Sequence, residues 1–240
     1  MSGQEKKAYI LAVQMIFQDP YSSLNPRKKI IQAVSEAPIA HGLVPAGDRD
    51  EFTVRTLEKV GLDPSLRNRY PHQFSGGQRQ RIGIARALAV NPEFLVCDES
   101  IAALDVSIQA QIINLFLDLR EELDLTYMFI SHDLSVVRHI SDRVAIMYLG
   151  RVVELASAKD IFADANHPYS QALLAEAPQI TEGHRTFHPI KGEVPSAINP
   201  PSGCHFHPRC PHATALCKTE KPELKEIAPG RFSACHLNAA

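Results

Sequence analysis

Short apolar runs that end in polar residues organise the first part of the chain. One run spans residues 94–97 and ends in Asp98-Glu99, and another spans residues 125–130 and ends just before His132. Apolar runs of this length, bounded by polar residues, are typical of buried strands in a parallel sheet. The chain therefore carries at least two predicted strands whose carboxyl ends bear polar side chains.

A helical pattern fills the space between these two runs. Apolar residues recur there at helical spacing: Ile108, Ile112, Leu115, Phe116, Leu119 and Leu123. Asp105 stands where it could cap the start of the helix. A strand, a helix and a second strand of these lengths predict a right-handed βαβ unit, and hence an α/β fold with a parallel sheet.

The pattern changes twice more along the chain. Residues 30–90 have a mainly helical pattern, and residues 143–148 and 152–155 flank Leu149-Gly150 as a predicted hairpin. Beyond residue 155, proline and glycine punctuate the chain and long apolar runs are few. We therefore predict a core over residues 1–155, with a helical subdomain at about 30–90, and an extension over residues 156–240.

The N-terminus combines two lysines with an apolar run over residues 10–17, a pattern shared with secretory signals. Gln14 interrupts the run, Gln18 ends it, and no small-residue cleavage site follows, so a buried strand is the better interpretation. No apolar stretch approaches the roughly 20 residues that a membrane span needs. We expect a cytosolic protein.

Composition narrows the function classes. The chain is 45% apolar and 22% charged, as expected for a globular protein, and its formal charge is −2. Basic residues do not cluster, so nucleic acid is not an expected partner. Four of the five cysteines follow residue 200. Because cytosolic thiols stay reduced, this usage indicates metal chemistry rather than disulfides.

Polar residues at the predicted strand ends form a candidate site. Ligands of open α/β sheets bind at the carboxyl ends of the strands, where Gln18, Asp98-Glu99 and His132 stand. Paired carboxylates suit phosphoryl transfer, because one can hold magnesium and the other can orient or deprotonate water. The alternative is that the two acids only cap the following helix.

The octet FSGGQRQR, residues 74–81, begins a predicted helix. Its glycines leave backbone N–H groups free for an anion, and the helix dipole and the hydroxyl of Ser75 favour binding as well. An ordinary N-cap would explain the turn but not the whole octet. We interpret Arg79, Arg81 and Arg86 as solvated or paired surface charges.

Taken together, these segments resemble the ATP-binding cassette proteins. FSGGQRQRIGIARAL is similar to their signature motif, FLVCDES to their Walker B strand, AALD to their D-loop and ISHD to their switch-histidine region. IFQDPYSSLNPR upstream resembles the Q-loop, and all five segments follow the family's order. The resemblance covers residues 10–235 and implies a P-loop NTPase, RecA-like sheet with a helical signature subdomain.

The resemblance also implies roles for individual residues in binding ATP and Mg²⁺. Gln18 would sense magnesium and the γ-phosphate, Asp98 would serve magnesium, and Glu99 would act as general base. His132 would contact the γ-phosphate, and Asp105 would communicate across a dimer. Ser100-Ile101 replaces the Pro-Thr of many relatives but removes neither carboxylate.

The signature residues have a different partner. Ser75, Gly76, Gly77 and Gln78 would bind the γ-phosphate of a nucleotide held mainly by a second ATPase subunit, because family members form head-to-tail dimers.

One family element has no match. G-x-x-x-x-G-K-[ST], which cradles the phosphates, does not occur in the 240 residues. Only 17 residues precede Gln18, so we expect a chain shortened at its N-terminus, an incomplete sheet with exposed apolar edges, and a tendency to aggregate. Such a chain would complete a sister subunit's ATP site better than its own.

The extension points to a subfamily. His167-Pro168-Tyr169 and KGEVPSAINPPSGCHFHPRCP resemble the C-terminal region of oligopeptide, dipeptide and nickel importers. The spacing of its four cysteines names no metal by itself. The resemblance implies a four-iron four-sulfur cluster on Cys204, Cys210, Cys217 and Cys235, with zinc and free thiols as alternatives. Histidines interleaved with them could also be ligands, whereas Cys97 is interpreted as inert core.

The leading hypothesis is therefore an ATPase subunit of a peptide importer, peripheral to the cytoplasmic face of the inner membrane. Two transmembrane permease subunits would be its partners, and a periplasmic or extracellular substrate-binding protein would act with it indirectly. An inactive remnant that only lends its signature motif to a sister is the second hypothesis. A free-standing metal-binding module is the third, and it leaves residues 1–155 unexplained.

Overall fold

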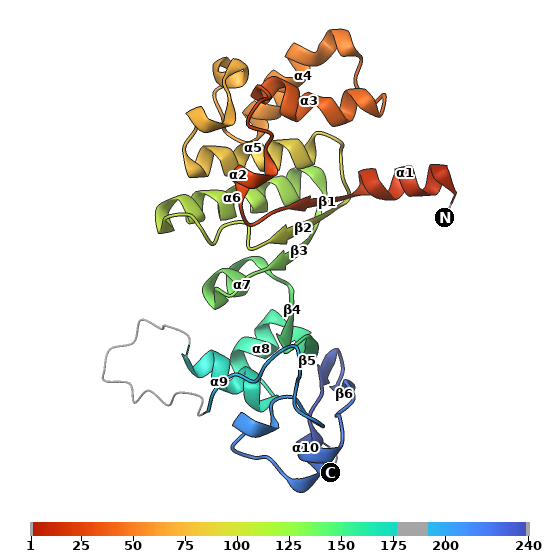
Figure 1. The fold of residues 1–240 in the computed structure, drawn as a ribbon, viewed down its shortest axis with the longest axis vertical. Helices are drawn as coiled ribbons and strands as arrows, with labels where there is room; N and C mark the ends of the chain where they lie inside the picture. Colours follow the sequence, from red (N-terminus) through yellow and green to blue (C-terminus); the bar gives the residue numbers. More distant parts are fainter. Residues whose placement is uncertain (1, 177–191, 239–240) are drawn as a thin grey trace. The chain divides into compact units, whose positions relative to one another are not determined.

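The computed structural model describes residues 2–176 and 192–238 (Figure 1). The chain divides into two compact units, residues 1–132 and residues 133–240. Within the described residues, no helix is long and apolar enough to cross a membrane.

The first unit is built on a parallel sheet. Strands β1 (Val13–Ile16), β2 (Phe94–Asp98) and β3 (Thr126–Ile130) lie in the order β1-β2-β3. Helix α6 (Val106–Leu123) connects β2 to β3, which confirms the predicted βαβ unit. The carboxyl ends of the three strands therefore meet at one edge of the sheet, as the candidate site requires.

One face of this sheet is covered. Cys97 of β2 is fully buried and pairs in register with Ile16 of β1 and Phe129 of β3. Phe116 of α6 makes an edge-on ring contact with Phe129, with ring centroids 5.8 Å apart. Burial raises the pKa of Cys97 to about 12, so its thiol stays protonated and belongs to the core, in agreement with its interpretation as an inert residue.

The opposite face of the sheet is open. Side chains alternate along a strand, so Met15, Val96 and Met128, which share one register line, lie on the face away from Cys97. Met128 is 47% exposed, and Ile130 on the same face is 42% exposed. Helices normally cover both faces of a parallel sheet, so the exposed apolar surface of this unit lies on a sheet face, whereas the sequence led us to expect it at the sheet edges.

We predict that this open face drives self-association. Replacing Met128 by Gln and Ile130 by Thr should raise the soluble concentration of the chain at least about twofold, because an exposed apolar patch is removed. Light scattering at increasing concentration measures the effect. Val106→Ser removes an even more exposed apolar side chain, 81% exposed, at the start of α6 and away from the open sheet face, and should change nothing. Equal behaviour of both variants would contradict the prediction.

Helices dominate residues 30–90, as predicted, and a short helix precedes them. They are α2 (Pro20–Ser23), α3 (Ile30–Ala40), α4 (Arg49–Lys59) and α5 (Gly76–Leu88), with short 3₁₀ turns at 46–48, 64–68 and 71–73. α3, α4 and α5 pack on one another through buried side chains that include Val34, Leu57 and Ile82. Gly61 follows α4 with φ +67°, a conformation that glycine adopts without strain.

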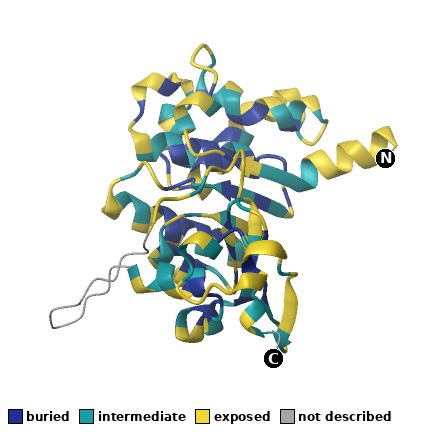
Figure 2. Ribbon diagram, turned by 60° about the horizontal axis from the view of Figure 1, so that its bottom comes forward, coloured by how far each residue is buried: buried dark blue, intermediate teal, exposed yellow. Residues whose placement is uncertain are grey.

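The N-terminal strand is shorter than predicted. Residues 3–12 form the exposed helix α1 (Gly3–Ala12), and the strand begins only at Val13 (Figure 2). Ser2 and Glu5 form a capping box that starts the helix. Val13 is also the first residue with a partner on β2, and a strand needs a partner along its length. The prediction of a strand from Ile10 was therefore wrong over its first three residues.

The second unit contains an antiparallel sheet in the order β4-β5-β7-β6. Its strands are β4 (Arg143–Tyr148), β5 (Arg151–Ser157), β6 (Lys225–Ala228) and β7 (Arg231–Ser233), and β4 with β5 confirms the predicted hairpin. Its helices are α7 (Leu134–Ile140), α8 (Ala158–Asp164), α9 (Pro168–Glu176) and α10 (Ala215–Thr219). Further 3₁₀ turns lie at 207–209 and 236–238.

The boundary between the two compact units, after residue 132, lies before the composition change near residue 155. Residue 155, predicted as the end of the core, lies inside β5 and pairs with Phe232 of β7. Val144, Val153 and Phe206 share one hydrophobic cluster, so the hairpin packs with C-terminal residues. Composition reveals where proline and glycine accumulate, but it cannot reveal which distant strand pairs with the hairpin.

Candidate functional site

Three predicted site residues meet at the carboxyl edge of the parallel sheet. Gln18 Nε2 donates a hydrogen bond to Glu99 Oε2 at 2.5 Å, and His132 Nδ1 lies 3.1 Å from Glu99 Oε1. Each side chain follows a different strand, β1, β2 or β3. The fold therefore holds the Glu99 carboxylate by both oxygens, between an amide and an imidazole.

The backbone at Glu99 is unusual. Its φ is +44°, which is uncommon for a residue other than glycine, and its N–H donates to the carbonyl of Ile130 at 3.0 Å. Such conformations cluster at functional sites, because surrounding structure must hold them. Asp98, the last residue of β2, is half-buried beside it. Ser100 and Ile101, where many relatives have Pro-Thr, are buried.

Ser75 opens α5 through a capping box. Its Oγ accepts from the N–H of Gln78 at 3.3 Å, and Gln78 Oε1 accepts from the N–H of Ser75 at 3.0 Å. Ser75 and Gly76 are exposed, so the Ser75 hydroxyl proton and the Gly76 N–H remain open to an incoming anion. Over the described residues, no hydrogen bond joins this end of α5 to the Gln18, Glu99 and His132 group.

Gly77 has a packing role that sequence reasoning missed. A Cβ placed on Gly77 would lie 2.6 Å from Cγ2 of Ile108, whereas at Gly76 the nearest atom, on Leu104, would be 3.8 Å away. Contacts below 3.0 Å require something to move. Gly77 therefore allows α5 to approach α6 closely, in addition to any contact with an anion.

We predict a specific coupling between Gly77 and Ile108. Gly77→Ala should destabilise the chain by about 1–2 kcal/mol, because the overpacking cost exceeds the gain in helix propensity. Adding Ile108→Ala to Gly77→Ala should remove the clash and restore part of the stability. A double-mutant cycle measured by urea unfolding should therefore give a coupling energy of at least about 1 kcal/mol. Gly83→Ala is the matched control in α5, since its Cβ would meet nothing within 4 Å. Simple additivity of the two changes would contradict the steric explanation.

The three arginines after the signature motif are donors to the fold. Arg79 Nε donates to the carbonyl of Pro71 at 3.0 Å, and Arg81 donates to the carbonyl of Val60 at 2.6 Å. Arg86 donates to the carbonyl of Ser23. Of the two interpretations from the sequence, solvated or paired, the second is therefore correct, but the partners are backbone carbonyl oxygens.

Asp105 occupies the N-cap position of α6 without a side-chain capping bond. Its backbone carbonyl accepts from Gln109, while its carboxylate is exposed. The prediction that Asp105 stands at the start of this helix is confirmed, and its carboxylate is open to solvent or to another chain.

Four cysteines converge in the second unit. Cys204, Cys210, Cys217 and Cys235 line one small cavity, together with His167 and other residues. Nearby backbone N–H groups act to lower the pKa of three of the thiols: that of Phe206 acts on Cys204, that of His212 on Cys210 and that of Leu237 on Cys235. A backbone N–H close to a thiolate favours its charged form.

The thiols of this cavity also influence one another. Burial raises the pKa of Cys204, Cys210 and Cys235, and the neighbouring thiols raise each pKa further. Throughout the described ranges, no three His, Cys, Asp or Glu side chains are grouped as a site for a single metal ion. The four thiols thus share one small pocket without forming, as they stand, a site for a single ion.

Gly203 sets the backbone path into this cavity. Its φ is +63°, and an added Cβ would lie 2.4 Å from the carbonyl oxygen of Cys217. The N–H of Cys204 donates to that same oxygen at 2.8 Å. Only glycine lets these two segments approach so closely, so Gly203 places Cys204 beside Cys217.

A buried carboxylate on β5 holds the segment that leads into α9, where His167 lines the cavity. Glu154 is 2% exposed and accepts from the N–H groups of Asn166 at 2.7 Å and His167 at 2.9 Å, just before α9. His167 Nδ1 accepts from the N–H of Tyr169 at 3.1 Å. Sequence reasoning used His167 only as a family marker and did not find Glu154, which resembles any other polar residue of a strand.

Burial of His167 predicts a pH-dependent stability. It lowers the pKa of His167 to about 4, whereas the unfolded value is 6.5. Above pH 6.5 the ring is neutral in both states, and as pH falls toward 4 the unfolded chain binds the extra proton. Unfolding free energy should therefore drop by about 2 kcal/mol from pH 7 to pH 5. Urea unfolding measures this, and His167→Gln should flatten the profile; an unchanged slope would refute the explanation.

Two protein-family models match the chain. The ABC transporter model matches residues 1–102, and the model of the oligopeptide/dipeptide transporter C-terminal region matches residues 153–217. The oligopeptide transport ATP-binding protein AppF of Bacillus subtilis is 54% identical over 228 residues, which are 94% of this chain and 69% of AppF. A Sinorhizobium fredii protein that bears the name of a peptide ABC transporter ATP-binding protein, y4tS, is 50% identical over 98% of this chain and 67% of its own length.

Solved structures agree on the fold. CbiO1 of Clostridium perfringens, part of the ABC transporter complex CbiONQ, is similar with a TM-score of 0.61 and 28% identity over 68% of this chain and 64% of CbiO1. The ATP-binding cassette MJ0796, solved as a dimer in a post-hydrolysis state with ADP and Pi, is similar with a TM-score of 0.57 and 28% identity, over 66% of this chain and 68% of MJ0796.

Proposed function

Because the chain belongs to the ABC transporter family, as an ATP-binding subunit of the oligopeptide/dipeptide importer type, we propose that it works with a membrane-embedded permease to drive peptide import by ATP hydrolysis. The observation that carries this proposal is the contact of Gln18 and His132 with the two oxygens of Glu99. A carboxylate fixed in this way can orient and deprotonate an attacking water.

Each side chain at this edge of the sheet has its own proposed role. Glu99 is the proposed general base, and Gln18 and His132 hold its carboxylate. Gln18 and His132 would also contact the γ-phosphate, and Asp98, the last residue of β2, would serve the magnesium ion. Magnesium, when bound with ATP, neutralises phosphate charge. Carboxylate oxygen is the ligand type that it prefers, so Asp98 fits the ion.

We also propose which subunit's nucleotide the signature motif binds. Ser75, Gly76, Gly77 and Gln78 would act on a nucleotide held by a second ATP-binding subunit, in a head-to-tail dimer. The exposed start of α5 supports this. Asp105, with its exposed carboxylate at the start of α6, is a candidate for contact across the same interface.

The partners follow from this proposal. Two transmembrane permease subunits would receive the dimer at the cytoplasmic face of the inner membrane, and a periplasmic or extracellular substrate-binding protein would deliver the cargo. Peptides are the proposed cargo, with nickel as the alternative within the same subfamily.

For the four cysteines we propose a four-iron four-sulfur cluster, with zinc and free thiols as the alternatives. Four thiols that line one cavity support the proposal, because cysteine thiolates are the usual ligands of such clusters. Zinc also binds four cysteines, so metal analysis of the purified protein distinguishes the two centres.

Reconstitution tests the proposed function. The 240-residue chain is mixed with an intact ATP-binding subunit of the same importer and its two permease subunits in liposomes, and phosphate release is measured. We expect ATPase activity that depends on this chain, together with weak ATP binding by the chain alone. Failure to assemble with the sister subunit, or an activity that does not depend on this chain, would favour an inactive remnant.

A further inference from the structure

A second cavity of the C-terminal unit has no part in the proposed reaction. It measures about 530 Å³, and four stretches of chain line it: residues 148–153, 203–206, 221–224 and Ala234. Small-molecule sites typically measure 300–1,000 Å³. The cavity is therefore large enough for a small organic molecule.

The wall of this cavity carries an excess of positive charge. Arg151 and Lys221 contribute two cations, and neither forms an ion pair with another described residue. Glu223, the one carboxylate of the wall, lies 3.5 Å from Lys225 and is paired with it. An anion entering the cavity would meet two unpaired cations and a carboxylate that already has a partner.

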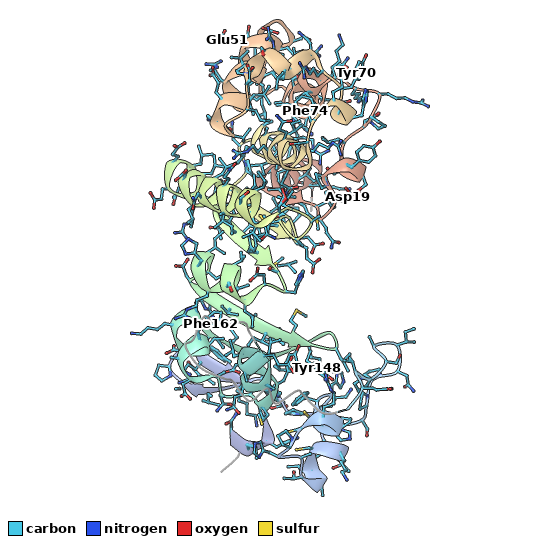
Figure 3. The ribbon with its side chains drawn as sticks, turned by 90° about the vertical axis from the view of Figure 1, so that its left-hand side faces the viewer. Asp19, Glu51, Tyr70, Phe74, Tyr148 and Phe162 are labelled. Carbon is cyan, nitrogen blue, oxygen red and sulfur yellow. The ribbon has the colours of Figure 1, made fainter. Side chains whose placement is uncertain are left out.

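The rest of the wall is apolar and aromatic. Val153, Phe206 and Leu224 contribute side chains, and Leu224 remains 41% exposed. Tyr148 packs edge-on against Phe206 with ring centroids 5.4 Å apart (Figure 3 labels Tyr148). An occupant with an apolar portion would remove this surface from water.

Two buried polar atoms of the wall have no hydrogen-bond partner. They are Oη of Tyr148, a residue 5% exposed, and Nδ1 of His205, a residue 8% exposed. An unsatisfied buried polar group costs about 1–3 kcal/mol, so each calls for an explanation. A ligand that carries a hydrogen-bond donor beside its anionic group would offset that cost.

We propose that this cavity binds a small organic anion, a carboxylate or a phosphate, that carries an apolar group. Arg151 and Lys221 would hold the anionic group, and Tyr148, Phe206 and Leu224 would enclose the apolar part. Cys204 lines both this cavity and the cysteine cavity, so an occupant would share a wall with the cysteine centre. The site does not depend on the proposed ATPase chemistry, and binding alone tests it.

The test is calorimetric titration of the full 240-residue chain with three probes. N-benzoylglycine supplies a carboxylate and phenyl phosphate a phosphate, while N-benzoylglycinamide is the neutral control. At least one anion should bind with a Kd below about 1 mM, and the amide should bind at least about tenfold more weakly. Whichever anion binds more tightly identifies the ligand class.

Variants locate the binding. Arg151→Met with Lys221→Met should weaken the anion about tenfold, because two pairings of up to about 1 kcal/mol each are lost. Both side chains are exposed, so the variant should fold, and its thermal unfolding is compared with that of the parent. Lys159→Met, on α8 outside the cavity, should leave the affinity unchanged. Absence of binding, equal binding of the amide, or binding that the double variant retains would overturn the proposal.

Discussion

Replacing Ser75 by Asp is expected to lower the ATPase activity of the assembled importer about 100-fold without unfolding this chain. The aspartate can still accept the hydrogen bond from the Gln78 N–H, so α5 keeps its cap. The same carboxylate would repel the γ-phosphate that the hydroxyl is proposed to bind, and loss of one oxyanion donor typically costs 10²–10³ in rate. Phosphate release from the reconstituted importer gives the result.

A matched control separates capping from phosphate binding. Ser2 caps α1 through the same kind of capping box, with Glu5 as its partner. Ser2→Asp therefore makes the same substitution at a capping serine outside the signature motif. We expect normal activity from Ser2→Asp and equal thermal stability from both variants. Ser75→Asp retaining more than half of the activity would exclude the signature role.

Glu99→Gln then separates the two proposed roles. Glu99 is the proposed general base, so its loss should lower phosphate release about 100-fold without weakening nucleotide binding by the sister subunit, whereas Ser75→Asp should weaken that binding as well. Unchanged phosphate release in Glu99→Gln would contradict the role of Glu99 as general base while leaving family membership intact.

The second large effect concerns the cysteine centre. Protein purified without oxygen should be brown and contain about four irons per chain, and Cys204→Ser with Cys210→Ser should lose the colour and nearly all of the iron. The reason is that both thiols line the same cavity and would each ligate the cluster. Absorbance and iron analysis measure the loss.

Two comparisons sharpen this experiment. Cys97→Ser changes a buried thiol of the parallel sheet that has no place in the cavity, and it should keep the iron. Gly203→Ala leaves every cysteine in place but forces its Cβ against the Cys217 carbonyl, so it should also lose iron. Colourless parent protein with one zinc per chain would rule out the cluster, and metal-free parent protein would favour free thiols.

Much of the secondary structure of both units was predictable because its signals are local. The helix from Val106, the Leu149-Gly150 turn and the later part of the strand predicted from Ile10 each follow from a few neighbouring residues, and all three occur in the structure. The N-terminal helix was missed because the same apolar run suits a strand or a helix, and pairing with β2 begins only at Val13.

The sequence by itself determined the order of the five motifs, the residue types of the nucleotide edge and the number of cysteines in the extension. Only the tertiary structure decided that Gln18 and His132 both contact Glu99, across 81 and 33 positions of chain, and that β5 pairs with β7. It also decided the open sheet face, the close contact of Gly77 with Ile108 and the cavity beside Cys204. Local patterns fix strands and helices because neighbouring residues share one backbone, whereas contacts between distant residues depend on how the whole chain packs.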